Sequence, residues 1–256
     1  MKQIKDLIVT KNERIGQRYV RLTLESPDAP LPAIVPGQFV EVSVPHPQVF
    51  LRRPISIHDV SADQRQLQLL VAVVGNGTRQ MAELKPGDKL NCVLPLGNGF
   101  TAPQAGETIL MAGGGVGTAP LLYLGRVARQ ANATPIFLIG AKTKNDLPDL
   151  QPYQALGQVH ITTEDGTAGE QGFVTQHSLL NHLSVSRIAV CGPKPMMKAV
   201  GQYALKNDIP CEVSLENLMA CGLGACLCCV EKTKEGHLCV CKEGPVFNIN
   251  RLTWFD

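Results

Sequence analysis

The sequence predicts a multi-domain protein: an antiparallel β-barrel, then an α/β domain with a doubly wound parallel sheet, then a small cysteine-rich domain. Three observations support this prediction. Short β-forming segments separated by turn residues fill residues 1–95, and alternating apolar strands and helices follow. Six of the nine cysteines fall between Cys221 and Cys241. We therefore place the three domains at residues 1–100, 101–210 and 211–256.

Six short segments make up the predicted barrel. Each is rich in β-forming residues and is bounded by turn residues, as at Pro36-Gly37 and Pro86-Gly-Asp88. Regular short strands with such turns between them are typical of antiparallel barrels. The predicted strands are Ile4–Val9, Tyr19–Leu24, Gln38–Val44, Ile55–Asp59, Leu67–Val73 and Lys89–Leu94.

Two stretches of the predicted barrel are candidate phosphate sites. In Arg52-Arg53-Pro54-Ile55-Ser56-Ile57, an arginine at a strand start offers a planar fork of donors suited to phosphate. Gly75-Asn76-Gly77-Thr78 precedes a predicted helix at Thr78–Leu84, and a helix N-terminus attracts anions. The ordinary alternatives are a solvated strand edge for the arginines and a turn with a threonine N-cap for the glycines.

The α/β domain begins after the Gly- and Pro-rich stretch Leu96–Gly106. Its elements alternate between strand and helix, a pattern that predicts a parallel sheet covered by helices. The predicted strands are Thr108–Ala112, Pro135–Ile139, Val159–Thr163 and Arg187–Cys191. The predicted helices are Leu121–Gln130, Leu147–Leu156, Val174–Leu183 and Pro195–Asn207.

Two loops of this domain suit a dinucleotide. Gly113-Gly114-Gly115-Val116-Gly117 lies between a strand and a helix, although Thr118 replaces the third glycine of the dinucleotide fingerprint. Cys191-Gly192-Pro193 likewise follows an apolar strand and precedes a helix. Gly140-Ala-Lys142 ends the second strand without an acidic residue, so the chemistry leaves NAD and NADP both open. No histidine lies in a ligand pair, and no catalytic acid or base is indicated.

The cysteine spacing predicts a [2Fe–2S] cluster. Cys221, Cys226 and Cys229 form C-x4-C-x2-C, the plant-type spacing, and a fourth cysteine lies further on. Zinc prefers two paired-cysteine arms, and an odd number of cysteines in a chain of 256 residues argues against a disulfide framework. If residues 238–241 form a strand, Cys239 and Cys241 share a face, and either could be the fourth ligand. The turn at Gly244-Pro245 favours Cys241, and Cys228 is expected to be a bystander.

Composition excludes several classes of protein. The net charge of +2 provides no basic surface for nucleic acid. No apolar run reaches membrane-spanning length, and the first residues lack the apolar segment of a secretory signal. We expect a cytoplasmic protein, because a reducing compartment keeps thiolates free to bind metal.

The barrel motifs resemble those of the ferredoxin-reductase superfamily, in which a flavin barrel precedes a pyridine-nucleotide domain. Its R-x-[YF]-[ST] motif falls on Arg53-Pro-Ile-Ser56, with Ile55 in place of the aromatic residue, and its glycine–hydroxyl motif falls on Gly75-Asn-Gly-Thr78. The resemblance implies that the Cys-Gly-Pro loop lies by the nicotinamide. The FAD site it implies is Arg53, Pro54, Ile55, Ser56, Leu70, Val71, Ala72, Gly77 and Thr78. The NAD site it implies is Gly113, Gly114, Gly115, Gly117, Cys191, Gly192 and Pro193.

Over its whole length the chain is similar to the electron-transfer subunits of NAD-dependent, two-subunit dihydroorotate dehydrogenases. Leu51–Ile57, Met219–Cys226 and Cys241–Phe247 carry this narrower resemblance. It implies FAD, NAD and one [2Fe–2S] cluster held by Cys221, Cys226, Cys229 and Cys241. It also implies an FMN-containing catalytic partner, in a heterotetramer of two copies of each subunit, and a role in pyrimidine (UMP) biosynthesis. Two alternatives remain: an NAD(P)H-dependent reductase of ferredoxin or sulfur compounds, and a non-enzymatic metal-binding subunit.

Overall fold

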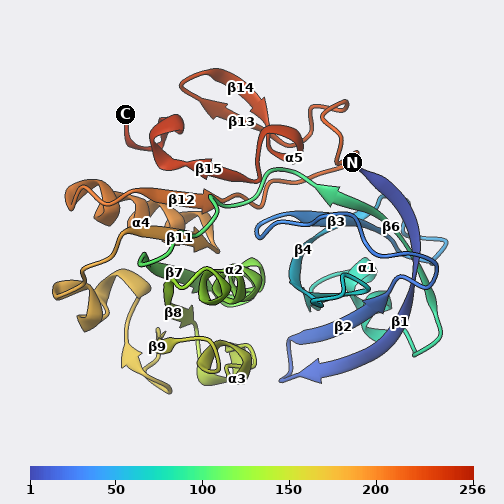
Figure 1. The fold of residues 1–256 in the computed structure, drawn as a ribbon, viewed down its shortest axis with the longest axis horizontal. Coiled ribbons are helices and arrows are strands. Elements are labelled where there is room, and N and C mark those ends of the chain that lie inside the picture. The colour runs from blue at the N-terminus through green and yellow to red at the C-terminus, as the bar shows by residue number, and fades with distance from the viewer.

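A closed six-stranded barrel forms the N-terminal part of the structure, a computed structural model that describes residues 1–256 (Figure 1). Its strands follow the order β1-β2-β5-β4-β3-β6, and all neighbours are antiparallel. A helix, α1 (Asn76–Glu83), connects the last two strands in sequence. The strand bounds are β1 Gln3–Ile15, β2 Tyr19–Glu25, β3 Phe39–Ser43, β4 Arg53–Val60, β5 Gln66–Ala72 and β6 Lys89–Leu96.

The long first strand closes the barrel. The N-terminal half of β1 pairs with β6 and its C-terminal half pairs with β2, with a register shift between Val9 and Lys11. In β3, Val40 and Val42 face the barrel core, whereas Phe39 packs with the core of the neighbouring domain. Because side chains alternate along a strand, Glu41 lies on the same outer face as Phe39. The predicted antiparallel barrel is confirmed.

A seven-stranded sheet forms the second layer, in the order β10-β9-β8-β7-β11-β12-β15. All neighbours are parallel except β15, which runs antiparallel to β12. The chain order reverses between β7 and β11, and ligands of such sheets bind at this switch point. The bounds are β7 Thr108–Gly114, β8 Thr134–Ala141, β9 Gln158–Thr163, β10 Glu170–Gln171, β11 Arg187–Cys191, β12 Cys211–Ser214 and β15 Val246–Asn248, with helices α2 Ala119–Gln130 and α4 Lys194–Lys206.

Two predicted helices of this domain differ from the structure. Leu147–Leu156 contains only one helical turn, α3 (Gln151–Gln154). Val174–Leu183 forms two separate 3₁₀ turns, Val174–Gln176 and Ser178–Asn181, because extended backbone at His177 divides them. The His177 ring accepts the N–H of Leu179, and the Gln176 side chain accepts that of Phe173. The Gln176 bond caps the first turn, as at any helix start. The His177 bond takes the Leu179 N–H, which a continuous helix would bond to a backbone carbonyl.

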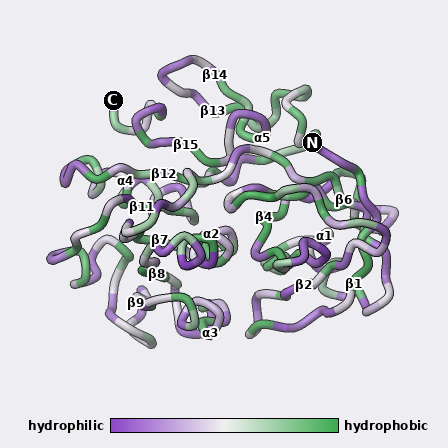
Figure 2. The backbone as a smooth tube through the Cα atoms, viewed as in Figure 1, coloured by the Kyte–Doolittle hydropathy of each residue, from purple (hydrophilic) through white to green (hydrophobic).

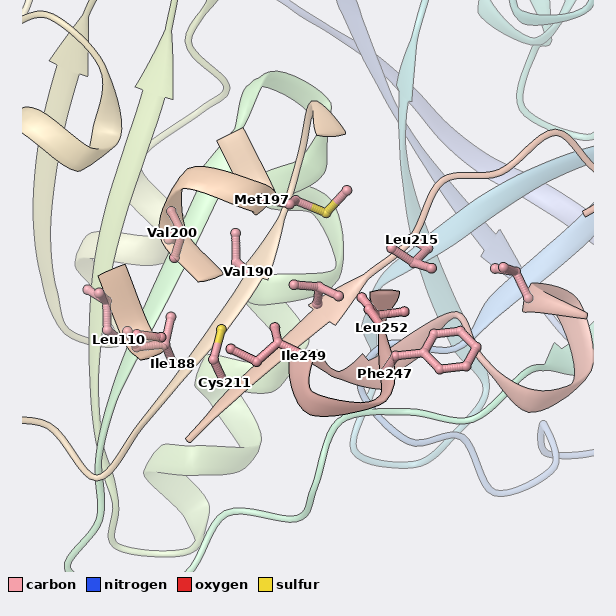
Figure 3. Close-up of a cluster of buried hydrophobic side chains, with 14 of the residues drawn as sticks. Leu110, Ile188, Val190, Met197, Val200, Cys211, Leu215, Phe247, Ile249 and Leu252 are labelled. Atoms are coloured by element: carbon pink, nitrogen blue, oxygen red, sulfur yellow. The ribbon is translucent and has the colours of Figure 1, made fainter. Parts of the chain in front are cut away.

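The cysteine-rich segment is inserted between two strands of the large sheet. After β12 the chain forms the hairpin β13 (Val230–Thr233) and β14 (Gly236–Cys239), then the short helix α5 (Val240–Glu243), and returns as β15. The sheet therefore extends beyond the predicted boundary between residues 210 and 211. Figure 3 shows the core that joins these parts, with Ile188 of β11 near Cys211 and Ile249, and with Leu252 near Phe247.

Helix α2 packs between the sheet and the barrel. Figure 2 shows both apolar and polar residues along it, as expected of a helix with two different neighbours. Its Arg126 forms an ion pair with Asp59 of the barrel at 2.6 Å, and the Tyr123 hydroxyl donates to the carbonyl of Ile34. The buried His58 ring lies 2.9 Å from the carbonyl oxygen of Ala119. The interface between the barrel and the sheet thus contains an ion pair, hydrogen bonds and packed side chains.

No helix combines the length and apolar character that crossing a membrane would require.

Candidate functional site

The predicted cluster ligands fall into two contacting pairs. The pKa of the Cys221 thiol is lowered to about 6, first by the N–H of Leu223, which lies 3.3 Å from its sulfur, and also by a hydrogen bond with Cys226. Cys229 accepts the backbone N–H of Cys241 at 3.4 Å and also bonds its side chain. A centre with two irons and four thiolates needs two thiolates on each iron, so this pairing suits it.

The loop between these pairs points backbone donors at sulfur. Gly224 donates its N–H to the sulfur of Cys241 at 3.1 Å. Gly222 and Gly224 have φ values of +65° and +84°, a left-handed conformation that glycine adopts without strain. Hydrogen bonds to ligand sulfurs raise the potential of iron–sulfur centres by stabilising negative charge. Without metal, burial raises the pKa of Cys241 to about 12, and Cys229 adds to this.

Cys239 is less suited than Cys241 to be the fourth ligand. Strand β14 ends at Cys239 and Cys241 lies in α5, so residues 238–241 are not one strand and the two cysteines do not share a strand face. The Cys239 thiol faces the carbonyl oxygen of Gly224 at 3.8 Å. The Cys228 side chain is exposed, but so is that of the predicted ligand Cys226, so exposure does not separate these two cysteines. No three thiol, imidazole or carboxyl groups converge in a ready metal-binding arrangement. The fit to a cluster therefore depends on the paired thiols and the backbone donors, which support Cys241 over Cys239.

The two predicted flavin motifs meet in the structure. A β-carbon built on Gly77 would lie 2.6 Å from Nε of Arg53, so the arginine side chain crosses directly over this glycine. The guanidinium also donates to the carbonyl of Leu51. The cationic group thus lies at the start of α1, where an anionic phosphate is favoured. This arrangement fits the diphosphate of FAD.

The other predicted flavin residues divide between surface and core. The Thr78 hydroxyl accepts the N–H groups of Val74 and Gly75, so it caps α1. Val71 is fully buried in the barrel core, and Leu70 is buried between the barrel and α2. Ala72 lines a cleft toward the nucleotide domain, whereas Pro54, Ile55 and Ser56 are partly exposed along β4.

A cleft of about 640 Å³ separates the barrel from the carboxyl ends of the sheet. Of the predicted nucleotide residues, Gly114, Gly115 and Pro193 line it. Gly117 instead packs so tightly that a β-carbon would lie 2.5 Å from the carbonyl oxygen of Cys191. A β-carbon on Gly192 would likewise lie 3.0 Å from the backbone nitrogen of Gly114. Gly117 and Gly192 therefore bring the two loops together beside the switch point, where Gly113 pairs with Cys191 and where a dinucleotide would bind.

Cys191 is an inert buried thiol beside a carboxyl group. Burial raises its pKa well above the usual value, and nearby Glu216 adds to the effect. The sulfur lies 3.6 Å from Oε1 of Glu216, which lines the cleft with Pro193 and Met196. Burial also raises the pKa of Glu216. Glu216 thus presents a carboxyl group at the predicted nicotinamide end, although sequence analysis did not identify it.

The opposite part of the cleft contains an ion pair that sequence analysis also missed. Arg18 of the barrel contacts Asp146 of the nucleotide domain at 2.6 Å, and the Tyr19 hydroxyl donates to the Asp146 backbone oxygen. Lys142 and Glu164 line the same cleft. No sequence motif relates residues 128 positions apart, so only the fold could have revealed this contact.

Comparison with known proteins agrees with this geometry. Residues 216–253 match the iron–sulfur cluster binding domain of dihydroorotate dehydrogenase B, and residues 111–202 match the oxidoreductase NAD-binding domain. The electron transfer subunit of dihydroorotate dehydrogenase B (NAD(+)) from Caldanaerobacter subterraneus subsp. tengcongensis is 37% identical over 250 residues, which cover 93% of this chain and 94% of that protein. The chain belongs to this family of electron transfer subunits. The protein of the same name from Desulforamulus reducens is 41% identical over 229 residues, covering 86% of this chain and 87% of that one.

Solved structures show the same similarity in three dimensions. A structure described as an NADH-dependent reduced ferredoxin-NADP oxidoreductase aligns with a TM-score of 0.85 and 27% identity, covering 97% of this chain and 90% of that one. A ferredoxin reductase of carbazole 1,9a-dioxygenase, at 21% identity and a TM-score of 0.71, shares the fold over 82% of this chain and 67% of its own. The predicted family, fold and cofactor set of FAD, a [2Fe–2S] cluster and NAD are confirmed. As a member of this family, the chain is the electron-transfer subunit of an oxidoreductase and works with a catalytic partner.

Proposed function

We propose that this subunit carries electrons from the FMN of a dihydroorotate-oxidising partner, through its [2Fe–2S] cluster and FAD, to NAD⁺ in UMP biosynthesis. One observation carries the proposal. Gly222, next to Cys221 in the cysteine loop, packs on Glu41 of β3, and β3 pairs with the flavin-motif strand β4. The predicted cluster and flavin sites are therefore separated by a single strand.

The redox chemistry of the three cofactors determines the order of electron transfer. A cluster passes single electrons, nicotinamide exchanges hydride, and a flavin does both, so the flavin belongs between them. The protein contributes binding and orientation: Arg53 and α1 for the FAD phosphates, Cys221, Cys226, Cys229 and Cys241 for the cluster, and the glycine loops for NAD. No side chain is required as a catalytic acid or base.

The partner subunit is proposed to dock over the cysteine loop. Three leucines of this segment expose 85%, 49% and 64% of their surface, namely Leu218, Leu223 and Leu227. Large apolar side chains gathered in one exposed loop are typical of an interaction surface. Contact there would bring the partner's FMN close to the cluster, and we propose an assembly of two copies of each subunit.

A second candidate function has specific support. The structure at 27% identity is described as an NADH-dependent reduced ferredoxin-NADP oxidoreductase. A reductase of ferredoxin or sulfur compounds with the same three cofactor sites would have the same cysteine loop. The two functions differ in the protein that donates or accepts electrons at this loop.

Two measurements test the proposal. The isolated chain, reconstituted with FAD and iron–sulfur cluster, should oxidise NADH with artificial acceptors and show no turnover of dihydroorotate. The complex with an FMN-containing dihydroorotate dehydrogenase subunit should reduce NAD⁺ with dihydroorotate. Turnover of dihydroorotate by the pure chain would overturn the assignment of roles, and failure of the complex with rapid reduction of ferredoxin would favour the second function.

A further inference from the structure

Glu41 is a buried carboxyl group that has no assigned role in the proposed electron transfer. It is fully buried, and neither carboxylate oxygen has a hydrogen-bond partner in the protein. Nearly all buried polar atoms in proteins are hydrogen-bonded, and leaving one without a partner is destabilising. A position that retains such a group invites a functional explanation.

The position of Glu41 links the two predicted electron-carrying sites. In the barrel it is paired with Pro54 of β4, within the flavin motif Arg53-Pro-Ile-Ser56, and on its other side with Val93 of β6. Its side chain reaches the cysteine loop, because a β-carbon on Gly222 would lie 2.7 Å from Cγ and 3.1 Å from Oε1 of Glu41. Gly222 follows the predicted ligand Cys221 directly. Glu41 thus fills the space between the flavin-motif strand and the cluster loop.

No neighbouring cation neutralises Glu41 through an ion pair. The Arg52 guanidinium donates to the backbone oxygens of Glu41 and Asn91 and to the Asn91 side chain. The Arg53 guanidinium donates to the backbone of Leu51 and Arg52. Burial raises the pKa of Glu41 to about 7. The positive charges of Arg52 and Arg53 oppose this rise, and the nearby Cys221 thiol adds to it. Glu41 therefore lies beside the cysteine loop with no ion-pair partner and no hydrogen-bond donor from the protein.

We propose that Glu41 is a positioning residue that holds the cluster loop against the flavin-binding strand and lowers the reduction potential of the [2Fe–2S] cluster. A reduced cluster carries one more negative charge than an oxidised one. A nearby buried carboxylate therefore disfavours the reduced state, because charges interact strongly where water is excluded. A lower cluster potential would favour onward transfer of the electron to the flavin. This inference rests on the proposed function, in which the cluster passes electrons to the flavin.

Glu41→Gln tests the charge while conserving the shape. In the full chain with its cofactors at pH 8.5, the variant should keep its iron, sulfide and flavin content, and its cluster potential should rise. We expect about a tenfold change in the ratio of reduced to oxidised cluster at a fixed ambient potential, the effect of one charge acting over about 10 Å at an effective dielectric constant of about 20. The potential is followed through the paramagnetic resonance signal of the reduced cluster. Glu41→Asp should retain most of the wild-type potential.

A matched control separates this effect from barrel stability. The Thr23 hydroxyl oxygen is also buried and unpartnered, but Thr23 lies on β2, and β3, which contacts the cysteine loop, is not a neighbour of β2. Thr23→Val should leave the cluster potential unchanged. An unchanged potential in Glu41→Gln, or an equal shift in Thr23→Val, would overturn the proposal. If Glu41→Gln loses its cluster, Glu41→Asp must show a wild-type potential or the inference fails. A wild-type chain without iron would instead refute the proposed function itself.

Discussion

The side chain of Arg53 lies across Gly77, so closely that a β-carbon on the glycine would come within 2.6 Å of Nε. Residues from the start of β4 and the start of α1, 24 positions apart, thereby form one cationic site. Each motif has an ordinary explanation when considered alone. Their contact explains why both are needed, because the arginine can reach the helix N-terminus only where the second residue lacks a side chain.

Gly77→Ala should reduce flavin binding. The added methyl group would displace the Arg53 guanidinium, whereas the helix itself should gain stability, since alanine is favoured over glycine inside helices by roughly 0.5–1 kcal/mol. Gly75→Ala is the matched control, because nothing lies within 4 Å of a β-carbon there and its φ is −149°. Flavin content after dialysis, measured by absorbance, should fall only in Gly77→Ala. Equal flavin content in both variants would show that the Arg53 position is unimportant.

Arg53→Ala should weaken FAD binding while the cluster persists. Loss of one charge-assisted hydrogen bond costs on the order of 1.5–3 kcal/mol, which corresponds to roughly 10- to 150-fold in the dissociation constant. Fluorescence titration of the apoprotein with FAD measures the change. Arg79→Ala removes an exposed arginine from the same helix, one that bonds Asn76, and should have little effect. If affinity for FAD is retained in Arg53→Ala, another residue holds the phosphates.

Single Cys→Ser variants should identify the cluster ligands. Cys241→Ser should lose or strongly perturb the cluster, because Cys241 contacts Cys229 and receives the N–H of Gly224. Cys239→Ser and Cys228→Ser should keep it. Iron content and the paramagnetic resonance signal of the reduced cluster report the result. The opposite outcome at positions 239 and 241 would assign the fourth ligand to the end of β14.

Acid should destabilise the barrel through His58. Burial lowers the pKa of His58 to about 4, although the hydrogen bond with the Ala119 carbonyl acts in the opposite direction. Below pH 6.5 His58 is protonated in the unfolded chain but stays neutral in the folded chain. The contribution of His58 to the free energy of unfolding is therefore complete above pH 6.5 and is lost as the pH falls toward 4. Between pH 7 and pH 5 the loss should be about 2 kcal/mol.

Urea unfolding at the two pH values, for wild type and His58→Gln, measures this contribution. The glutamine variant should be less stable at pH 7 and should lose less of its stability on acidification. An identical pH dependence in both proteins would mean that other groups cause the acid sensitivity.

The features that could be predicted from the sequence are those in which residues close together in the chain determine the local structure. The cysteine spacing, the short barrel strands and the glycine loops each reflect a constraint within a few residues. The predicted helix at Val174–Leu183 failed because the His177 ring accepts the Leu179 N–H, which a continuous helix would bond to a backbone carbonyl. Glu41 and Glu216 were missed for another reason. Their surroundings come from segments far apart in the chain, and an isolated glutamate in a sequence looks like a surface residue.

The insertion of the cysteine loop between β12 and β15 fixes both of its ends in one sheet. Val213 pairs with Phe247, so the chain leaves and re-enters the sheet on neighbouring strands. A redox domain joined by a single flexible linker must search for its acceptor before each transfer, and linker length then limits the rate. Here the spacing between donor and acceptor is set when the chain folds. Turnover should therefore be insensitive to solvent viscosity at every step except nucleotide exchange and association with the partner.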